Sequence, residues 1–233
     1  MLKTFAGKSL FITGTDTDVG KSVITAALAL CLEKMGYDVA VYKPLQSGAY
    51  FEKDGLIAPD LAFVRKFSKT IACKCSYLLE GECSPALAMK LARVPFSLDT
   101  IKADFTALRK EHDIVLVEGA GGLLCPVSFE NKLAMADIIQ YLALPCLIVA
   151  RSGLGTINHC LLTEKIAKQY GLHVNAFLLN RFPKKAAETA TQYVCEELAR
   201  YTDTPVVRAE ELSQLTAENL AGIFQDKIER VIG

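Results

Sequence analysis

The sequence lacks an excess of charge of either sign. Its 233 residues contain 26 basic and 26 acidic side chains. Proteins that bind nucleic acid nonspecifically need a surplus of basic residues, so this balance disfavours that class. The chain also lacks any apolar run of the ~18 residues that a membrane span requires, and its first eight residues lack the apolar segment of a secretory signal. We therefore expect a cytoplasmic protein that binds neither nucleic acid nor membrane.

Histidine is scarce as well, and none of the 3 histidines lies near the cysteine cluster Cys73, Cys75 and Cys83. The spacing of this cluster differs from that of the usual zinc sites, so we do not expect a metal there. The chain has 8 cysteines in all, and several lie in apolar runs such as residues 145–149. We expect these thiols to be buried and reduced, as in cytosolic proteins, and not joined as disulfides.

The chain contains no repeat, linker or low-complexity tract, and 51% of its residues are hydrophobic. Its length suits a single α/β domain that spans residues 1–233. Apolar, strand-like segments alternate with segments that carry helix start and stop signals. This alternation predicts an α/β fold with one doubly wound, mainly parallel sheet and helices on both faces. The predicted strands are residues 9–13, 38–42, 114–117, 145–150 and 174–179, and the predicted helices are residues 23–36, 59–67, 84–93, 97–110, 134–142 and 155–171, with two more from about residue 184 and about residue 216.

The most informative segment is Gly14-Thr-Asp-Thr-Asp-Val-Gly-Lys-Ser22, which lies between a predicted strand and a predicted helix. A glycine-containing turn followed by Gly-Lys-Ser at the start of a helix is typical of a phosphate-binding loop. Its backbone N–H groups and the helix dipole favour a polyphosphate, Lys21 adds a positive charge, and the Ser22 hydroxyl can bind Mg²⁺. Five residues separate Gly14 from Gly20 where the common motif has four, so the loop is a variant. Its context favours this interpretation over an ordinary strand-to-helix turn.

Two other strand ends carry polar residues that could complete such a site. Glu118 follows the predicted strand 114–117, where a carboxylate can reach a cation bound at the loop. Lys43 and Ser47 follow the strand 38–42 in a segment, residues 43–48, that we predict to be a loop. Ligands of open α/β sheets bind beyond the carboxyl ends of the strands. Glu118 could be a loop glutamate that faces water, but the flanking strand and glycines favour the functional interpretation. Lys43, taken alone, is better interpreted as a solvated loop lysine.

These three segments occur in order with a fourth segment that begins at Gly155. Together they resemble the dethiobiotin synthase family over nearly the whole chain. The four segments are the loop ending at Ser22, Lys43-Pro-Leu-Gln-Ser-Gly48, Val117-Glu-Gly-Ala-Gly-Gly122 and Gly155-Thr-Ile-Asn-His159. The resemblance implies an ATP-dependent ring closure in biotin synthesis. The implied reactants are 7,8-diaminopelargonic acid, CO₂ or bicarbonate, and MgATP. It also implies a homodimer whose subunits share the substrate site.

The resemblance implies roles for individual residues. Lys21 and Lys43 would be catalytic lysines, the first at the ATP phosphates and the second beside the substrate carbamate. The implied Mg²⁺ ligands are Ser22, Asp60 and Glu118, with Asp54 as a competing candidate for the place of Asp60. The implied nucleotide-binding residues are Asp18, Val19, Gly20, Lys21, Ser22, Val23, Asp60, Glu118, Gly119, Ala120, Gly121 and Asn180. The implied substrate-binding residues are Lys43, Ser47, Gly155, Thr156, Asn158 and Tyr193.

The segment that begins at Gly155 also has a physical interpretation. It opens a predicted helix, and the free N–H groups of a helix N-terminus can hold the carboxylate of a substrate. Helix capping by Thr156 alone is the alternative that needs no ligand. Residues 206–211 depart from the family pattern, because they lack the glycine and second proline usually found beside the base. This departure leaves the nucleotide-base preference and the role of Arg208 open.

Two other functions are compatible with a P-loop. An amidotransferring ligase that acts on another substrate would need a glutaminase domain, and no such domain fits in this chain. A partition- or septum-type ATPase switch would need a surface that binds membrane or DNA. The mildly amphipathic C-terminal segment, residues 222–232, pairs its basic residues with acidic ones, unlike a membrane-binding helix.

Overall fold

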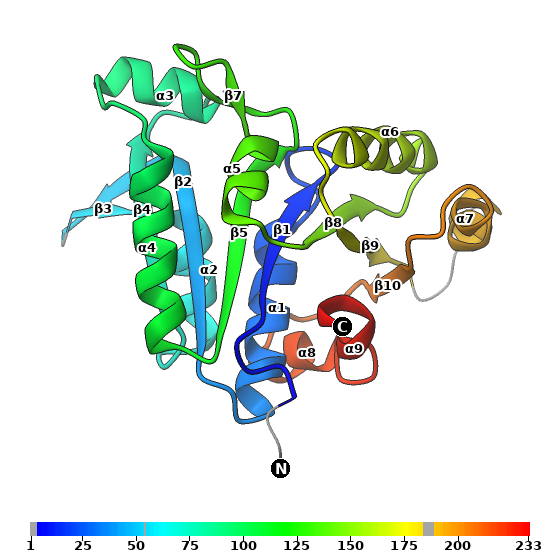
Figure 1. Cartoon of the computed structure of the whole chain (residues 1–233). Helices are drawn as coiled ribbons and strands as arrows, with labels where there is room; N and C mark the ends of the chain where they lie inside the picture. The colour runs from blue at the N-terminus through cyan, green and yellow to red at the C-terminus, as the bar shows by residue number, and fades with distance from the viewer. Residues whose placement is uncertain (1–3, 54, 184–188) are drawn as a thin grey trace.

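The fold is built on an eight-stranded sheet, as the computed structural model describes it over residues 4–53, 55–183 and 189–233 (Figure 1). Its parallel strands follow the order β10-β9-β8-β1-β5-β2-β4, and β3 pairs antiparallel with the end of β2. A separate two-stranded ribbon, β6-β7, lies outside this sheet. The strands are β1 (Ser9–Gly14), β2 (Val39–Glu52), β3 (Gly55–Ile57), β4 (Ala72–Glu80), β5 (Ile114–Gly122), β6 (Pro126–Ser128), β7 (Leu133–Ala134), β8 (Cys146–Arg151), β9 (Val174–Phe182) and β10 (Val206–Glu210).

The winding of the chain reverses at β1. From β1 the chain forms β2, β4 and β5 on one side, and then β8, β9 and β10 on the other. In open α/β sheets, ligands bind at such a reversal, in the crevice beyond the carboxyl ends of the strands. The topology therefore predicts a ligand site at the loop that follows β1.

Helices cover both faces of the sheet because successive side chains of a strand point to opposite faces. Leu10 and Ile12 of β1 pack in one core with α1, α2, α8 and α9, whereas Phe11 packs in the other with α3, α4, α5 and α6. Figure 1 shows α4 and α2 on opposite sides of β2. The helices are α1 (Lys21–Lys34), α2 (Pro59–Phe67), α3 (Pro85–Ala92), α4 (Leu98–Glu111), α5 (Met135–Leu142), α6 (Thr156–Gln169), α7 (Thr189–Ala199), α8 (Ala217–Gly222) and α9 (Ile228–Ile232).

The predicted fold class is confirmed, and the predicted helix signals lie where expected. Proline occupies the first turn of α2 and of α3, and the Ser97 hydroxyl caps α4 by accepting a hydrogen bond from the Thr100 N–H at 3.4 Å. Gly36 follows α1 with a φ of 88°, as a left-handed C-terminal glycine should. Residues 184–188 lie outside the described residues, so the predicted start of a helix near 184 is followed only from Thr189, where α7 begins.

One predicted loop is wrong. Residues 43–48 belong to β2, which runs on to Glu52 because β4 lies beside it and pairs with it from Ala40 to Ala49. The sequence analysis missed β4, and without that neighbour the turn-rich residues after Tyr42 looked like a loop. Lys43 is consequently held by a strand in the sheet.

Other structural features bear on the excluded classes. All 8 cysteines lie in the described residues as free thiols, but only Cys31, Cys146 and Cys160 are buried, and the others are half-buried. None of the described helices has the length and apolar character needed to cross a membrane. In the C-terminal segment, Ile228, Val231 and Ile232 are buried in the core. The apolar residues of α9 are therefore already packed against the protein itself.

Candidate active site

The loop between β1 and α1 folds around the ammonium of Lys21. Asp18 and Gly20 adopt left-handed backbone conformations, with φ values of 56° and 95°. Lys21 begins α1, and its Nζ donates a hydrogen bond to the carbonyl of Asp16 at 2.9 Å. A Cβ atom at Gly14 would lie 2.9 Å from that same carbonyl, so only glycine fits there. The loop thus holds a lysine and a helix N-terminus together, as a site for phosphate requires.

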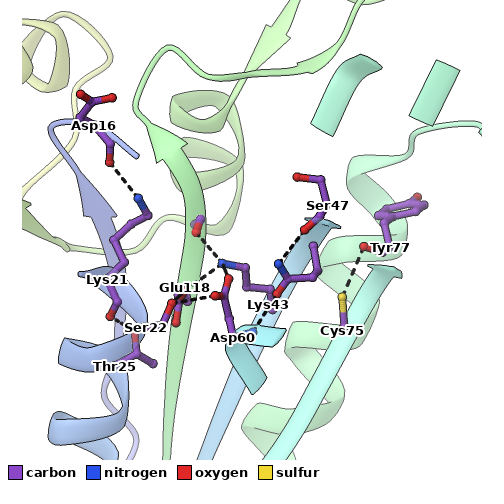
Figure 2. A network of polar contacts seen from close by, with 12 residues as sticks. Asp16, Lys21, Ser22, Thr25, Lys43, Ser47, Asp60, Cys75, Tyr77 and Glu118 are labelled. Carbon is purple, nitrogen blue, oxygen red and sulfur yellow. Dashed lines mark hydrogen bonds and ion pairs between the residues drawn. The ribbon is translucent and has the colours of Figure 1, made fainter. Parts of the chain in front are cut away.

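Three side chains whose oxygen atoms could bind a cation meet beside this loop (Figure 2). The Ser22 hydroxyl of α1 lies 2.8 Å from Oδ1 of Asp60 in α2 and 2.9 Å from Oε1 of Glu118 in β5. A hydroxyl has one proton and can donate it to only one of these carboxylates at a time. Asp54, the competing candidate, lies outside the described residues. Asp60 is therefore the aspartate that the structure brings to Ser22 and Glu118.

Lys43 lies against the same two carboxylates. Its Nζ donates to Glu118 Oε1 at 2.9 Å and to the carbonyl of Gly119 at 3.0 Å, and it forms an ion pair with Asp60. The parallel register that places Tyr42 of β2 beside Val117 of β5 brings Lys43 next to Glu118. The side chain of Lys43 is only 2% exposed. Lys43 is thus a buried cation shared between two carboxylates.

Burial and these charges shift the pKa values in opposite directions. Burial alone would lower the pKa of Lys43, but the Glu118 and Asp60 carboxylates raise it above the ordinary value. Burial raises the pKa of Glu118, although Lys43 opposes the shift. Burial would also raise the pKa of Asp60, but the charge and hydrogen bond of Lys43 lower it. Burial and the charge of Lys43 lower the pKa of Lys21.

The chemistry of this cluster fits a hard divalent cation. Among the buried side-chain atoms of the described residues, only Oε2 of Glu118 and Oγ1 of Thr13 have no hydrogen-bond partner. An unpartnered carboxylate oxygen in the interior is costly unless a ligand satisfies it. Mg²⁺ prefers oxygen ligands and usually takes one or two carboxylates together with phosphates and waters. Ser22, Asp60 and Glu118 therefore make a set of residues that Mg²⁺ fits.

A cavity of about 760 Å³ connects these groups. Lys43, Gln46 and Ser47 line it on the side of β2, and Arg181 lines it at the end of β9. The predicted site residues that line this cavity are Asp18, Gly20, Lys21, Ser22, Val23, Lys43, Ser47, Asp60, Glu118, Ala120 and Gly121. Of the remaining nucleotide-binding predictions, Val19 is buried in the core beside the cavity, and Gly119 contributes its carbonyl to Lys43.

Asn180 holds the phosphate-binding loop in place. It is 5% exposed, its Nδ2 donates to the carbonyl of Val19 at 2.9 Å, and its Oδ1 accepts from the N–H of Arg181 at 2.8 Å. A Cβ at Gly20 would lie 2.1 Å from Nδ2 of Asn180. Asn180 and the loop therefore pack in direct contact, and its predicted contact with the nucleotide stays a prediction.

The substrate-binding residues predicted beyond β5 do not line this cavity in the described chain. Gly155 and Asn158 are exposed at the start of α6, and Tyr193 is 45% exposed on α7. The Thr156 hydroxyl donates to the carbonyl of Arg151 at 2.6 Å, and α6 has no side-chain cap. The alternative in which Thr156 caps the helix is therefore wrong, and no side chain caps the N-terminus of α6.

Sequence reasoning missed Gln46 and Arg181. The Gln46 side chain accepts from the Asp60 N–H at 3.4 Å and donates to the Ser47 carbonyl at 2.9 Å, so it ties β2 to α2. Gln46 lies inside the Lys43–Gly48 segment, and this position could have identified it as a site residue. The open question of Arg208 has a structural answer, because its guanidinium lies over the ring of Phe182, 5.2 Å from the centroid.

Known proteins share both the sequence and the fold. Residues 8–219 match a family model described as an AAA domain. The chain is 41% identical over 203 residues to the ATP-dependent dethiobiotin synthetase of Anoxybacillus flavithermus. The aligned region covers 86% of this chain and 90% of that protein. It is 40% identical over 181 residues to the dethiobiotin synthetase of Clostridium perfringens, with 76% and 79% covered. The chain belongs to the dethiobiotin synthetase family.

Two solved structures are similar to this chain in fold. The MinC:MinD cell division complex of Aquifex aeolicus matches with a TM-score of 0.56 and 12% identity over 93% of this chain and 86% of that chain. The signal recognition particle receptor FtsY of Elizabethkingia anophelis matches with a TM-score of 0.52 and 16% identity, over 97% and 68%. At such low identities the match concerns the arrangement of the sheet and helices alone.

Proposed function

We propose that this chain is a dethiobiotin synthase that uses ATP to close a cyclic urea from 7,8-diaminopelargonic acid and CO₂. The observation that carries the proposal is the convergence of Lys21, Ser22, Lys43, Asp60 and Glu118 on one cavity. This set supplies cations and cation ligands for a phosphoryl transfer, and it occurs in a chain whose relatives are named dethiobiotin synthetases.

The proposed reaction has three bond-forming steps. First, one amine nitrogen of the diamine bonds to the carbon of CO₂ and loses a proton, which gives a carbamate. Next, a carbamate oxygen bonds to the γ-phosphorus of ATP, and the bond from that phosphorus to the β–γ bridging oxygen breaks, which releases ADP. Finally, the second amine bonds to the carbamate carbon and loses a proton, and phosphate leaves as the ring closes.

The residues of this chain have separate tasks in that sequence. Lys21 and the N-terminal N–H groups of α1 hold the phosphates, because both present positive charge to the cavity. Lys43 of β2, which is separated from β1 by β5, would hold the carbamate anion as it approaches the negative γ-phosphate. Two anions repel strongly in a partly dry site unless a cation lies between them. Ser47, which lines the cavity near Lys43, offers a hydroxyl for the substrate.

Ser22, Asp60 and Glu118 are the residues that would hold Mg²⁺ in this proposal. When bound, Mg²⁺ neutralises phosphate charge and favours attack at phosphorus. Lys43 can turn its ammonium to the carbamate once its two carboxylates have another positive partner. Burial would lower the pKa of Lys43, but the Glu118 and Asp60 carboxylates raise it, which keeps the side chain charged at neutral pH.

We also propose that two copies of the chain share the substrate site. Gly155, Thr156, Asn158 and Tyr193 do not line the cavity of their own chain, yet no side chain caps the N-terminus of α6. Such a terminus suits the carboxylate of the diamine substrate. A second subunit would bring these residues to the end of a substrate held at Lys43.

The test is product formation. Purified protein is incubated with ATP, Mg²⁺, isotopically labelled bicarbonate and 7,8-diaminopelargonic acid, and dethiobiotin is sought by mass spectrometry. We expect labelled dethiobiotin and ADP in equal amounts, and no ADP when the diamine is omitted. ADP release that continues without the diamine, with no dethiobiotin formed, would instead identify an ATPase switch. The Lys21→Ala variant is the matched control, and it should form neither product.

A further inference from the structure

Arg181, at the end of β9, has an unusual backbone for its residue type. Its φ is 52°, in the left-handed region that residues other than glycine rarely occupy. Beside it, Arg208 pairs with Leu179 and Glu210 pairs with Phe182, so β9 uses one more residue than β10 over this stretch. An extra residue of this kind is a β-bulge, and bulges beside active sites re-aim a side chain.

The neighbouring chain fixes this bulge on both sides. The N–H of Arg181 donates to Asn180 Oδ1 at 2.8 Å, and the carbonyl of Arg181 accepts from the Ser152 hydroxyl at 3.1 Å. One residue later, the carbonyl of Phe182 accepts from the N–H of Glu211 at 2.8 Å. Strained conformations persist only when their surroundings determine them, and they gather at ligand sites. Arg181 combines this strain with a place in the lining of the cavity, and we infer from the two together that its side chain binds a ligand.

The bulge directs an exposed arginine to one end of the cavity of about 760 Å³. In the sheet, β5 and β2 carry Glu118 and Lys43 on one side of β1, whereas β8 and β9 lie on its other side. A nucleotide whose outer phosphate lies at Glu118 and Lys43 and whose inner phosphates lie on the loop after β1 must extend its nucleoside toward β9. Arg181 lies where that nucleoside would emerge.

We propose that Arg181 binds the nucleoside end of the nucleotide, with its planar guanidinium stacked on the base. The inference rests on the proposed function in taking the cavity to hold ATP. Asn180, the preceding residue, uses one hydrogen of its Nδ2 and one lone pair of its Oδ1 on the backbone. Arginine stacks on aromatic faces, and every base has such a face, so this contact adds affinity without selecting among bases. Arg181 therefore anchors the nucleotide and leaves base preference weak.

The experiment replaces the guanidinium without disturbing the bulge. Asparagine tolerates the left-handed region, so Arg181→Asn removes the side chain's plane and charge while the backbone keeps its conformation. Arg181→Lys keeps the charge and removes the plane. Arg93→Asn is the matched control, because Arg93 is also exposed, has a φ of 55° and does not line this cavity. Calorimetry measures binding of ATP, GTP and inorganic tripolyphosphate, each with Mg²⁺.

We expect Arg181→Asn to weaken ATP and GTP binding by about 10-fold each, the order of one lost stacking contact. Tripolyphosphate, which has no base, should bind as tightly as to the wild type. Arg181→Lys should stay close to Arg181→Asn, and Arg93→Asn should bind all three ligands normally. In the steady state, the KM for ATP should rise, whereas kcat and the KM for the diamine should not change.

Two outcomes would overturn the inference. Unchanged ATP binding in Arg181→Asn would remove the contact, and an equal loss of tripolyphosphate binding would assign Arg181 to a phosphate. The inference and the proposed function fail separately. A wild type that binds ATP but forms no dethiobiotin contradicts the function alone, while normal ATP binding by Arg181→Asn in an enzyme that forms dethiobiotin contradicts only the role of Arg181.

Discussion

Replacing Lys43 by glutamine tests the charge balance of the site. The substitution removes the ammonium that lies 2.9 Å from Glu118 and forms an ion pair with Asp60. Breaking a buried ion pair by removing one partner costs about 3–5 kcal/mol of unfolding free energy. Glutamine keeps part of the stem and a hydrogen-bond donor, and the Asp60 side chain is 26% exposed, so solvent compensates part of the loss. We therefore expect Lys43→Gln to lower the free energy of unfolding by about 2–4 kcal/mol near neutral pH without Mg²⁺.

The loss should depend on pH in a defined direction. Burial raises the pKa of Glu118, and in the wild type the charge of Lys43 opposes this rise. The Lys43→Gln variant lacks that charge, so the pKa of Glu118 should rise further. The folded variant then binds a proton that the unfolded chain has already released, so its stability falls as pH rises above the unfolded pKa of ~4.3. In the wild type, Asp60 has a lowered pKa and acts in the opposite sense: its stabilisation is present above the unfolded value and is lost as pH falls through the folded pKa. The gap between wild type and variant should therefore be wider at about pH 8 than at about pH 5.

Urea unfolding followed by circular dichroism measures this gap, and Lys74→Gln is the control. Lys74 of β4 forms an ion pair with Asp104 of α4 at 2.8 Å, but the Lys74 side chain is 40% exposed. Such a surface pair contributes about 0–1 kcal/mol. In activity assays, Lys43→Gln should bind ATP nearly normally and lose product formation by at least ~100-fold, as when a key electrostatic group is removed. A variant with the pH profile of the wild type and near-normal turnover would refute the reasoning, as would one that no longer binds ATP.

Three further substitutions test other parts of the site. Lys21→Ala should abolish ATP turnover and leave the circular dichroism spectrum unchanged, and normal turnover would refute the P-loop assignment. Gly20→Ala should lower both Tm and ATP affinity, because its Cβ would lie 2.1 Å from Asn180 Nδ2, while Gly36→Ala, with a similar φ of 88° and nothing within 4 Å, controls for backbone strain. Equal losses in the two glycine variants would argue against that contact. Asn158→Ala should raise the KM for the diamine far more than that for ATP, and equal effects in steady-state kinetics would contradict a shared substrate site.

The sequence predicts the central strands well because their burial leaves a direct trace. β5 begins with Ile114-Val-Leu-Val117, a continuous apolar run typical of a strand that is covered on both faces of a parallel sheet. Strands toward the edges leave a weaker trace. β4 mixes cysteine, lysine and serine with apolar residues and is mostly half-buried, and β10 is a five-residue strand with alternating exposure. Neither strand has the continuous apolar run that identified β5, and both were missed.

The site shows the same division between local and long-range information. Lys21, Ser22 and Glu118 were predictable because a strand and a glycine-containing turn stand beside each of them in the sequence. Asp60 was preferred to Asp54 only through the family resemblance, because its place depends on how α2 packs beside α1 and not on a local motif. Arg181 left no signal at all, since its orientation comes from a bulge formed between β9 and β10.

Comparison of two buried glutamates separates a structural carboxylate from a functional one. Glu164 is 5% exposed, and its Oε1 accepts hydrogen bonds at 2.6 Å from the hydroxyls of both Thr202 and Thr204. Burial would raise its pKa, but these bonds lower it, so the folded protein favours its charge. Glu118 is 1% exposed, its pKa is raised by burial, and its Oε2 has no partner among the described residues. A buried acceptor without a partner destabilises the fold. Glu164 has no buried oxygen without a partner among the described residues. Stability therefore accounts for Glu164, whereas the unpartnered Oε2 of Glu118 is what we expect of a carboxylate that binds a ligand.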